Sequence, residues 1–214
     1  MKTIPNEKRL SGSIVLERGT SFLARQIIYH MKILAVLTGR KPAEYSHAEF
    51  LIWNEYEKFV DLTDNKGRKK QFRLERKTLY TVGARSKGIE ISEVSDYYTH
   101  NEIKVRVPKK LLTFEENWYL MQHFLLHDPA KYQYGNFAVW ITDLKIQPWL
   151  LILKPEKRKK LLEKIWLGTR KDKRFYCYRF VADMIKSIDR WTGDDDRVSI
   201  YDLLEVGGYE DYEP

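Results

Sequence analysis

The sequence predicts an α+β protein that folds as a single domain over residues 1–214. Amphipathic helical stretches and short strand-like runs both occur along the chain. Hydrophobic residues make up 43% and aromatic residues 14% of the chain, as in folded globular proteins. The chain has no internal repeat, low-complexity segment or linker-like stretch that would divide it. A length of 214 residues suffices for one substantial core.

The N-terminal part begins with a predicted strand over residues 13–16, which Gly19 closes. Thr20 can cap a helix that extends to about residue 37, and Gly39 is a typical C-terminal stop. Two β segments follow at residues 46–53 and 58–64, and the polar residues between them predict an antiparallel hairpin turning at 54–57.

Further strands are expected at residues 78–82 and 103–107. The T-x-x-E pattern of Thr113 and Glu116 predicts a capping box that opens a helix to about residue 127. A basic amphipathic helix is expected over 155–168, a further helix from Cys177 to about 191, and a short packed piece at 200–204. The aromatic stretch at 136–153 shows no clean period, so no element is predicted there.

The chain's one cysteine, Cys177, opens an apolar stripe at helical spacing that continues through Phe180, Val181, Met184, Ile185 and Ile188. The thiol is therefore expected in the first turn of a helix, where unpaired backbone N–H groups and the helix dipole favour the nucleophilic thiolate. The alternative is an inert cysteine that packs as a small hydrophobic residue.

A reactive thiolate needs a base beside it and a polar group that orients the base. His47 begins a predicted strand and shares its face with Glu49, Leu51 and Trp53. In the predicted hairpin, Asp61 lies nearly opposite His47 and can accept the imidazole N–H. The competing interpretation is two ordinary polar residues on the solvent face of a hairpin.

No metal or cofactor site is predicted. His123 and His127 have metal-ligand spacing on a helix, but Phe124 stands where the zinc-protease pattern requires glutamate, and no third ligand is evident. The chain also has no phosphate-binding loop, dinucleotide fingerprint or serine-nucleophile elbow.

The net charge of +8 is unevenly distributed, because residues 194–214 carry eight acidic residues and one arginine. The rest of the chain would attract anionic partners such as an anionic membrane surface or acidic polymers, or would be a solvated lysine-rich surface. No nucleic-acid reading motif accompanies the charge, so nucleic-acid binding is disfavoured. With one cysteine and no apolar signal segment, we expect a cytoplasmic protein.

Several short motifs, taken in order, resemble the circularly permuted, NlpC-like papain-fold family (the YiiX type), with the lecithin:retinol acyltransferase group as a more distant relative. They are the Ser11–Leu16 strand, the Tyr45-Ser46-His47 strand, the Ile103–Arg106 strand, the Tyr132–Gly135 segment, the Phe175–Val181 cysteine segment and the Ile200–Leu204 tail. The resemblance covers most of the chain. It implies an antiparallel sheet or small barrel packed against helices, with the cysteine at a helix N-terminus.

The resemblance also implies Cys177 as the nucleophile, His47 as the general base and a third polar residue on the following strand. We match that residue to Asp61, with Glu49 and Glu57 as alternatives because the turn length is uncertain. Tyr178 and Arg179 replace the family's Ser-Glu pair, and together with Tyr45 they are expected to contact substrate.

Two classes of function follow from the sequence. The first is a cysteine peptidase or amidase acting through a thioester on Cys177, or a related lipid-directed acyltransferase or thioesterase at an anionic membrane. The second is a binding module that keeps the fold without turnover, which the altered pair after the cysteine motivates. The sequence does not indicate an oligomeric state.

Overall fold

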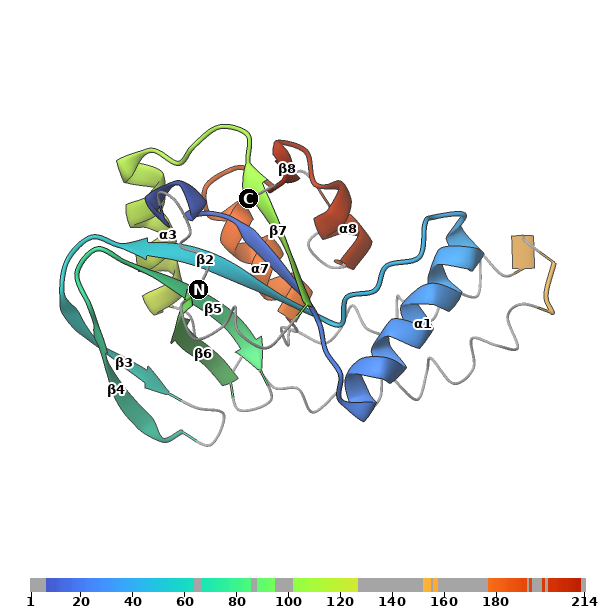
Figure 1. Cartoon of the computed structure of the whole chain (residues 1–214), viewed down its shortest axis with the longest axis horizontal. Coiled ribbons are helices and arrows are strands. Elements are labelled where there is room, and N and C mark those ends of the chain that lie inside the picture. Colours follow the sequence, from blue (N-terminus) through green and yellow to red (C-terminus); the bar gives the residue numbers. More distant parts are fainter. Residues whose placement is uncertain are drawn as a thin grey trace.

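The computed structural model describes residues 7–63, 67–85, 88–94, 102–126, 152–154, 156–157, 177–191, 193, 198 and 200–212. In this part of the chain an antiparallel sheet packs against helices, with the N-terminal helix extending to one side (Figure 1). The predicted α+β class is confirmed.

The main sheet has six strands in an order that differs from their order in the sequence. From one edge to the other these are β6 (Gly88–Glu93), β5 (Thr78–Arg85), β2 (His47–Asn54), β1 (Ile14–Arg18), β7 (Glu102–Pro108) and β8 (Tyr209–Asp211). All neighbours pair antiparallel. Strands β6 and β8 were not predicted, and β8 is only three residues long.

The predicted hairpin between residues 46–53 and 58–64 is wrong. Strand β2 pairs with β1 and β5, whereas β3 (Lys58–Thr63) pairs with β4 (Lys69–Leu74) in a separate two-stranded sheet. The β2–β5 and β3–β4 pairs share one register, because the numbers of two paired residues add up to 132 in both. The strands therefore form two arms of one long hairpin, in which β3 continues β2 and β4 leads into β5 (Figure 1).

Helix α1 (Phe22–Thr38) begins one residue later than predicted, because the side chain of Ser21, not Thr20, accepts the N–H of Ala24. It ends as predicted at Gly39, whose φ of 69° lies in the left-handed region that glycine tolerates.

Helix α3 (Phe114–Leu126) carries the predicted capping box. The Thr113 N–H donates to Glu116 Oε2 at 2.8 Å, and the Glu116 N–H donates to Thr113 Oγ1 at 3.1 Å. The remaining helices are the 3₁₀ turn η1 (Glu7–Leu10), α7 (Cys177–Lys186) and α8 (Ile200–Glu205). Most of the expected 155–168 helix and of the 136–153 stretch lies outside the described residues.

Helix α7 is central to the core and packs on β2 and β5. Phe180, Val181 and Met184 are fully buried there in one hydrophobic cluster with Phe50 and Ile52 of β2. A smaller cluster contains the alternate residues of the same strand, Leu51 and Trp53, as expected for a strand buried on both faces.

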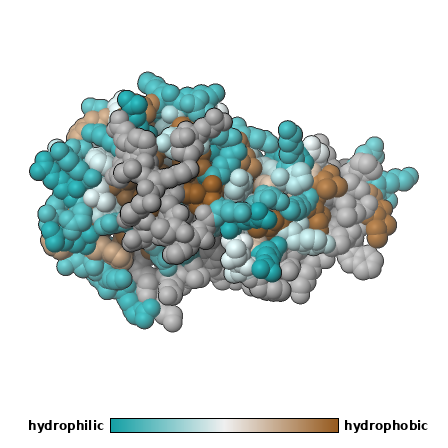
Figure 2. Space-filling view, viewed as in Figure 1, coloured by the Kyte–Doolittle hydropathy of each residue, from teal (hydrophilic) through white to brown (hydrophobic). Residues whose placement is uncertain are grey.

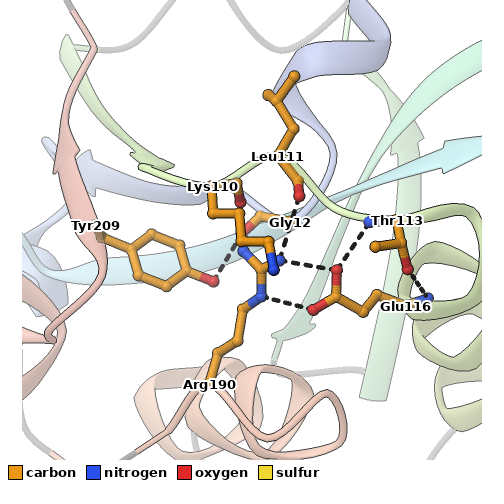
Figure 3. A network of polar contacts seen from close by, with 7 residues as sticks. All are labelled: Gly12, Lys110, Leu111, Thr113, Glu116, Arg190 and Tyr209. Carbon is orange, nitrogen blue, oxygen red and sulfur yellow. Dashed lines mark hydrogen bonds and ion pairs between the residues drawn. The ribbon is translucent and has the colours of Figure 1, made fainter.

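A polar network fixes the chain just beyond the C-terminal end of α7 (Figure 3). Arg190 donates through Nε and Nη2 to the two oxygens of Glu116, at 2.9 and 2.8 Å, and through Nη1 to the Lys110 carbonyl. Glu116 thereby joins the start of α3 to the end of α7. Among the described residues, no helix is long and apolar enough to span a bilayer.

Candidate functional site

Cys177 is the first residue of α7. All six members of the predicted apolar stripe are buried. The helix is shorter than predicted, because α7 ends at Lys186 instead of near residue 191, so Ile188 lies in the turn that follows it. Arg179, Asp183 and Lys186 are its more exposed positions, at polar spacing of four and three residues. The thiol is 5% exposed and lies at the end of the helix where the dipole is positive.

His47 is the first residue of β2, and its ring lies between Cys177 and Glu49. The ring Nε2 is 3.2 Å from Glu49 Oε1, and a side-chain hydrogen bond links the imidazole to Cys177. His47 and Glu49 are two residues apart in a strand, so their side chains lie on the same face. The side chain of His47 is 16% exposed and that of Glu49 is 2% exposed.

The pKa of His47 is raised from 6.5 to about 10. Burial by itself lowers the pKa of the ring, but the charges of Cys177 and Glu49 and their hydrogen bonds to the imidazole outweigh it. The imidazolium is therefore the favoured form near neutral pH. The charge of Cys177 that acts on the ring is that of its thiolate form, and an adjacent imidazolium favours that form.

Glu49 is held as a carboxylate within the protein. Burial favours the neutral acid, but the hydrogen bond and charge of His47, the charge of Arg85 and a hydrogen bond from Thr81 lower the pKa of Glu49 to about 2. Arg85 Nε donates to Glu49 Oε1 at 2.7 Å, while the Thr81 hydroxyl donates to Oε2. A charged residue this deeply buried thus has three partners.

Strand β5 supplies the room that Glu49 needs. Continuing the β2–β5 register places Gly83 opposite Glu49, and a Cβ atom at Gly83 would lie 2.7 Å from Glu49 Cγ. Any larger residue at this position would therefore displace the glutamate side chain.

Asp61, the predicted orienting residue, lies elsewhere. It is exposed on β3, opposite Gln71, whose side-chain amide donates to it at 3.4 Å. Because β3 continues β2 instead of folding back on it, Asp61 is carried away from His47. Glu57 is also distant from this contact and pairs with Arg73 at 3.0 Å. Of the three carboxylates considered, Glu49 is the one in contact with His47.

The predicted substrate residues differ in how deeply they are buried. Tyr178 is buried in the main core cluster, and Tyr45, next but one before His47, packs partly buried against the same cluster. Arg179 is half-buried. Their role toward substrate stays a prediction.

The described residues offer no metal centre, since no three of their His, Cys, Asp and Glu side chains gather as ligands. His123 lies 2.8 Å from Asp183 of α7 through Nε2 and Oδ2, and His127 lies outside the described residues. Of the two histidines considered as metal ligands, the described one, His123, contacts a carboxylate.

The sequence does not predict three neighbours of Glu49, namely Thr81, Gly83 and Arg85, all on β5. A glycine inside a strand indicates close approach of another group, but the predicted strand ends at residue 82, just before Gly83, whereas β5 extends to Arg85. The sequence does not indicate that the approaching group comes from residue 49, because the polar residues 54–57 predict a hairpin turn that is too early.

No family model and no curated protein matches this chain. Among solved structures, the chain is similar to the metalloprotein yiiX from Escherichia coli O157:H7, a DUF1105 protein. The two chains are 12% identical, the match covers 96% of this chain and 97% of the other, and the TM-score is 0.52. At this identity the likeness shows a YiiX-like fold and extends over nearly the whole of both chains.

Proposed function

We propose that this protein is a cysteine hydrolase that cleaves an amide bond through a thioester on Cys177. The observation that carries the proposal is the row Cys177–His47–Glu49, in which the central ring has a pKa of about 10. A nucleophile, a base and a group that orients the base are the parts that thiol hydrolysis requires. Glu49 takes the orienting role for which Asp61 was predicted.

In the first step the Cys177 sulfur attacks the carbonyl carbon, and the electron pair of the C=O bond moves to oxygen. The backbone N–H of Cys177, at the start of α7, is suitably placed to stabilise the resulting oxyanion. When the C–N bond breaks, the His47 imidazolium gives its proton to the leaving amine. Neutral His47 then takes a proton from water, which attacks the thioester and releases the carboxylic acid and the thiolate.

The role of Glu49 in this scheme is to orient and charge-stabilise the ring. Its Oε1 faces Nε2 of His47, which leaves Nδ1 as the ring nitrogen for proton exchange with sulfur and substrate. Activity is expected to fall as pH rises through about 10, because His47 then loses the proton that the leaving amine needs.

The test is a comparison of the wild type with Cys177→Ala and His47→Gln on a panel of peptide anilides and N-acyl amides. We expect hydrolysis of at least one member by the wild type and a loss of at least about a thousandfold in each variant. Full activity in Cys177→Ala would show the proposal to be wrong. A thiol whose iodoacetamide reactivity has an ordinary pH dependence that His47→Gln leaves unchanged would instead favour a binding module. Because the chain has one cysteine, the alkylated site is unambiguous.

A lipid-directed acyltransferase or thioesterase is a second candidate, which the surface of α1 supports. Tyr29 and Val36 of this helix are 55% and 68% exposed, and the space-filling view shows hydrophobic and hydrophilic side chains next to one another over α1 (Figure 2). Apolar and cationic side chains on one helix suit an anionic membrane surface. Cosedimentation with acidic liposomes that is lost at high salt would favour this candidate, and no sedimentation at low salt would exclude it.

A further inference from the structure

An open pocket of about 640 Å³ lies between the start of α1 and the adjoining ends of β1 and β7. Arg18 is the last residue of β1 and Glu102 the first of β7, while Arg25, Tyr29 and Lys32 come from α1. The pocket thus combines three cationic side chains with an aromatic side chain and one carboxylate.

The cations of this pocket are incompletely neutralised. Glu102 pairs with Arg18 at 2.7 Å, and Glu44, outside the lining, pairs with Arg18 and Lys32 at 3.4 and 3.0 Å. Arg25 donates to the Thr20 carbonyl at 3.1 Å and has no carboxylate partner among the described residues. As far as the described residues show, its guanidinium is therefore available to an anion.

The backbone adds to this positive field. Arg25 lies in the first turns of α1, which has no acidic residue in its first turn. Helix N-termini carry partial positive charge and usually have acidic side chains nearby, so a cation there is unfavourable unless an anion approaches. A bound anion would relieve this repulsion and accept hydrogen bonds from Arg25.

The pocket adjoins the Cys177–His47 pair through the ends of the strands. Gly19 lines the pocket, and its N–H donates to Ser46 Oγ at 3.0 Å. Ser46 immediately precedes His47, and His47 pairs with Glu17 of β1. The pocket and His47 therefore lie at the same ends of β1 and β2, and a molecule that extends from the pocket along these strand ends would approach the reactive pair.

We propose that this pocket binds an anionic group of the substrate, a carboxylate or phosphate carried on an apolar portion. Arg25 and Lys32 hold the anion, and Ile28 and Tyr29 contact the apolar portion. The assignment of this ligand as substrate rests on the proposed hydrolase function, whereas the binding itself does not.

Octyl phosphate and its neutral analogue octanol can test the pocket in the Cys177→Ala background, where no turnover occurs. Titration calorimetry below the micellar concentration should show octyl phosphate binding that weakens with salt, and octanol binding at least about tenfold weaker. Arg25→Gln should weaken octyl phosphate binding by about tenfold or more. Arg73→Gln removes the same charge from the exposed β3–β4 ribbon and should leave binding unchanged.

Equal binding of octyl phosphate and octanol, or equal effects of Arg25→Gln and Arg73→Gln, would overturn the proposal. Vesicles of phosphatidylglycerol form a separate arm that distinguishes the source of the anion. If Arg25→Gln abolishes binding to vesicles while soluble octyl phosphate does not bind, the anion is a membrane headgroup. If neither octyl phosphate nor the vesicles bind, the proposed anion site is wrong. Amide hydrolysis by Cys177 is measured separately and does not depend on that result.

Discussion

At the scale of single residues, Glu49 decides the character of the site. It is a carboxylate with 2% exposure whose pKa is about 2, held by an imidazole, a guanidinium and a hydroxyl. Leaving a charge buried without partners costs several kcal/mol, and these contacts together keep Glu49 ionised. The ionised carboxylate in turn helps His47 keep its proton.

Replacing Glu49 by Gln should make the Cys177 thiolate less stable. The amide keeps the size of the side chain but removes the charge that supports the imidazolium, so the pH dependence of iodoacetamide alkylation should shift upward by about one pH unit. Mass spectrometry of the alkylated protein measures this. The matched control is Asp61→Asn, which should leave the profile unchanged. A shift in the control and none in Glu49→Gln would identify Asp61 as the orienting residue after all.

Acid should remove the stabilisation that Glu49 provides. Its pKa is lowered on folding from 4.5 to about 2, so its contribution is fully present above about pH 4.5 and is lost as pH falls toward 2. A difference of this size corresponds to ~3 kcal/mol. Urea unfolding of the wild type and Glu49→Gln from pH 7 to pH 2 should therefore show a stability difference that shrinks below pH 4.5. A difference that stays constant down to pH 3 would contradict the assignment.

At the scale of elements, the hairpin formed by β2–β3 and β4–β5 positions the site. Its constant register brings β5 alongside β2 and places Gly83 and Arg85 beside Glu49. The predicted turn at residues 54–57 and the stretch between β3 and β4 are both polar in the sequence. Local turn composition could not decide between them, because a register is fixed by which faces become buried across the whole sheet.

Gly83→Ala tests the close approach of β5 to Glu49. The added Cβ would meet Glu49 Cγ at 2.7 Å, so we expect a loss of ~1–3 kcal/mol in unfolding free energy, as for overpacked cores. The alkylation profile of Cys177 should shift upward as well, because a displaced carboxylate supports His47 less. Gly207→Ala is the control, since a Cβ there meets nothing within 4 Å. An unchanged alkylation profile in Gly83→Ala would mean that Glu49 tolerates displacement.

At the scale of the whole molecule, hydrogen bonds join parts of the chain that are far apart in the sequence. The Tyr209 hydroxyl donates to the Gly12 carbonyl at 3.0 Å across 197 positions, and Arg190 reaches Glu116 across 74 positions (Figure 3). Tyr201 of α8 donates to the Met31 carbonyl of α1 at 2.6 Å. These links join α8 to α1, Tyr209 of β8 to the segment before β1, and the segment after α7 to the start of α3.

Glu116→Gln should weaken this arrangement. The amide cannot accept both charged hydrogen bonds from Arg190 and also serve the capping box, so we expect ~1–3 kcal/mol lower stability in urea unfolding. Glu115→Gln, at the exposed neighbouring position of α3, changes the same charge and should have little effect. Equal effects of the two variants would assign the loss to the helix dipole instead of the Arg190 network.

The sequence by itself determined the elements that short-range rules govern. Helical periodicity predicted the buried stripe from Cys177 to Ile188, the T-x-x-E pattern predicted the capping box, and the glycine rule predicted the end of α1. The family resemblance had paired His47 with Cys177, 130 residues away, but local patterns could not, and only the tertiary structure decided that Glu49 and not Asp61 contacts His47. The physical reason is that strand pairing and charge burial are long-range: they depend on which strands meet and which carboxylate finds compensating donors, and neither is encoded in a local pattern.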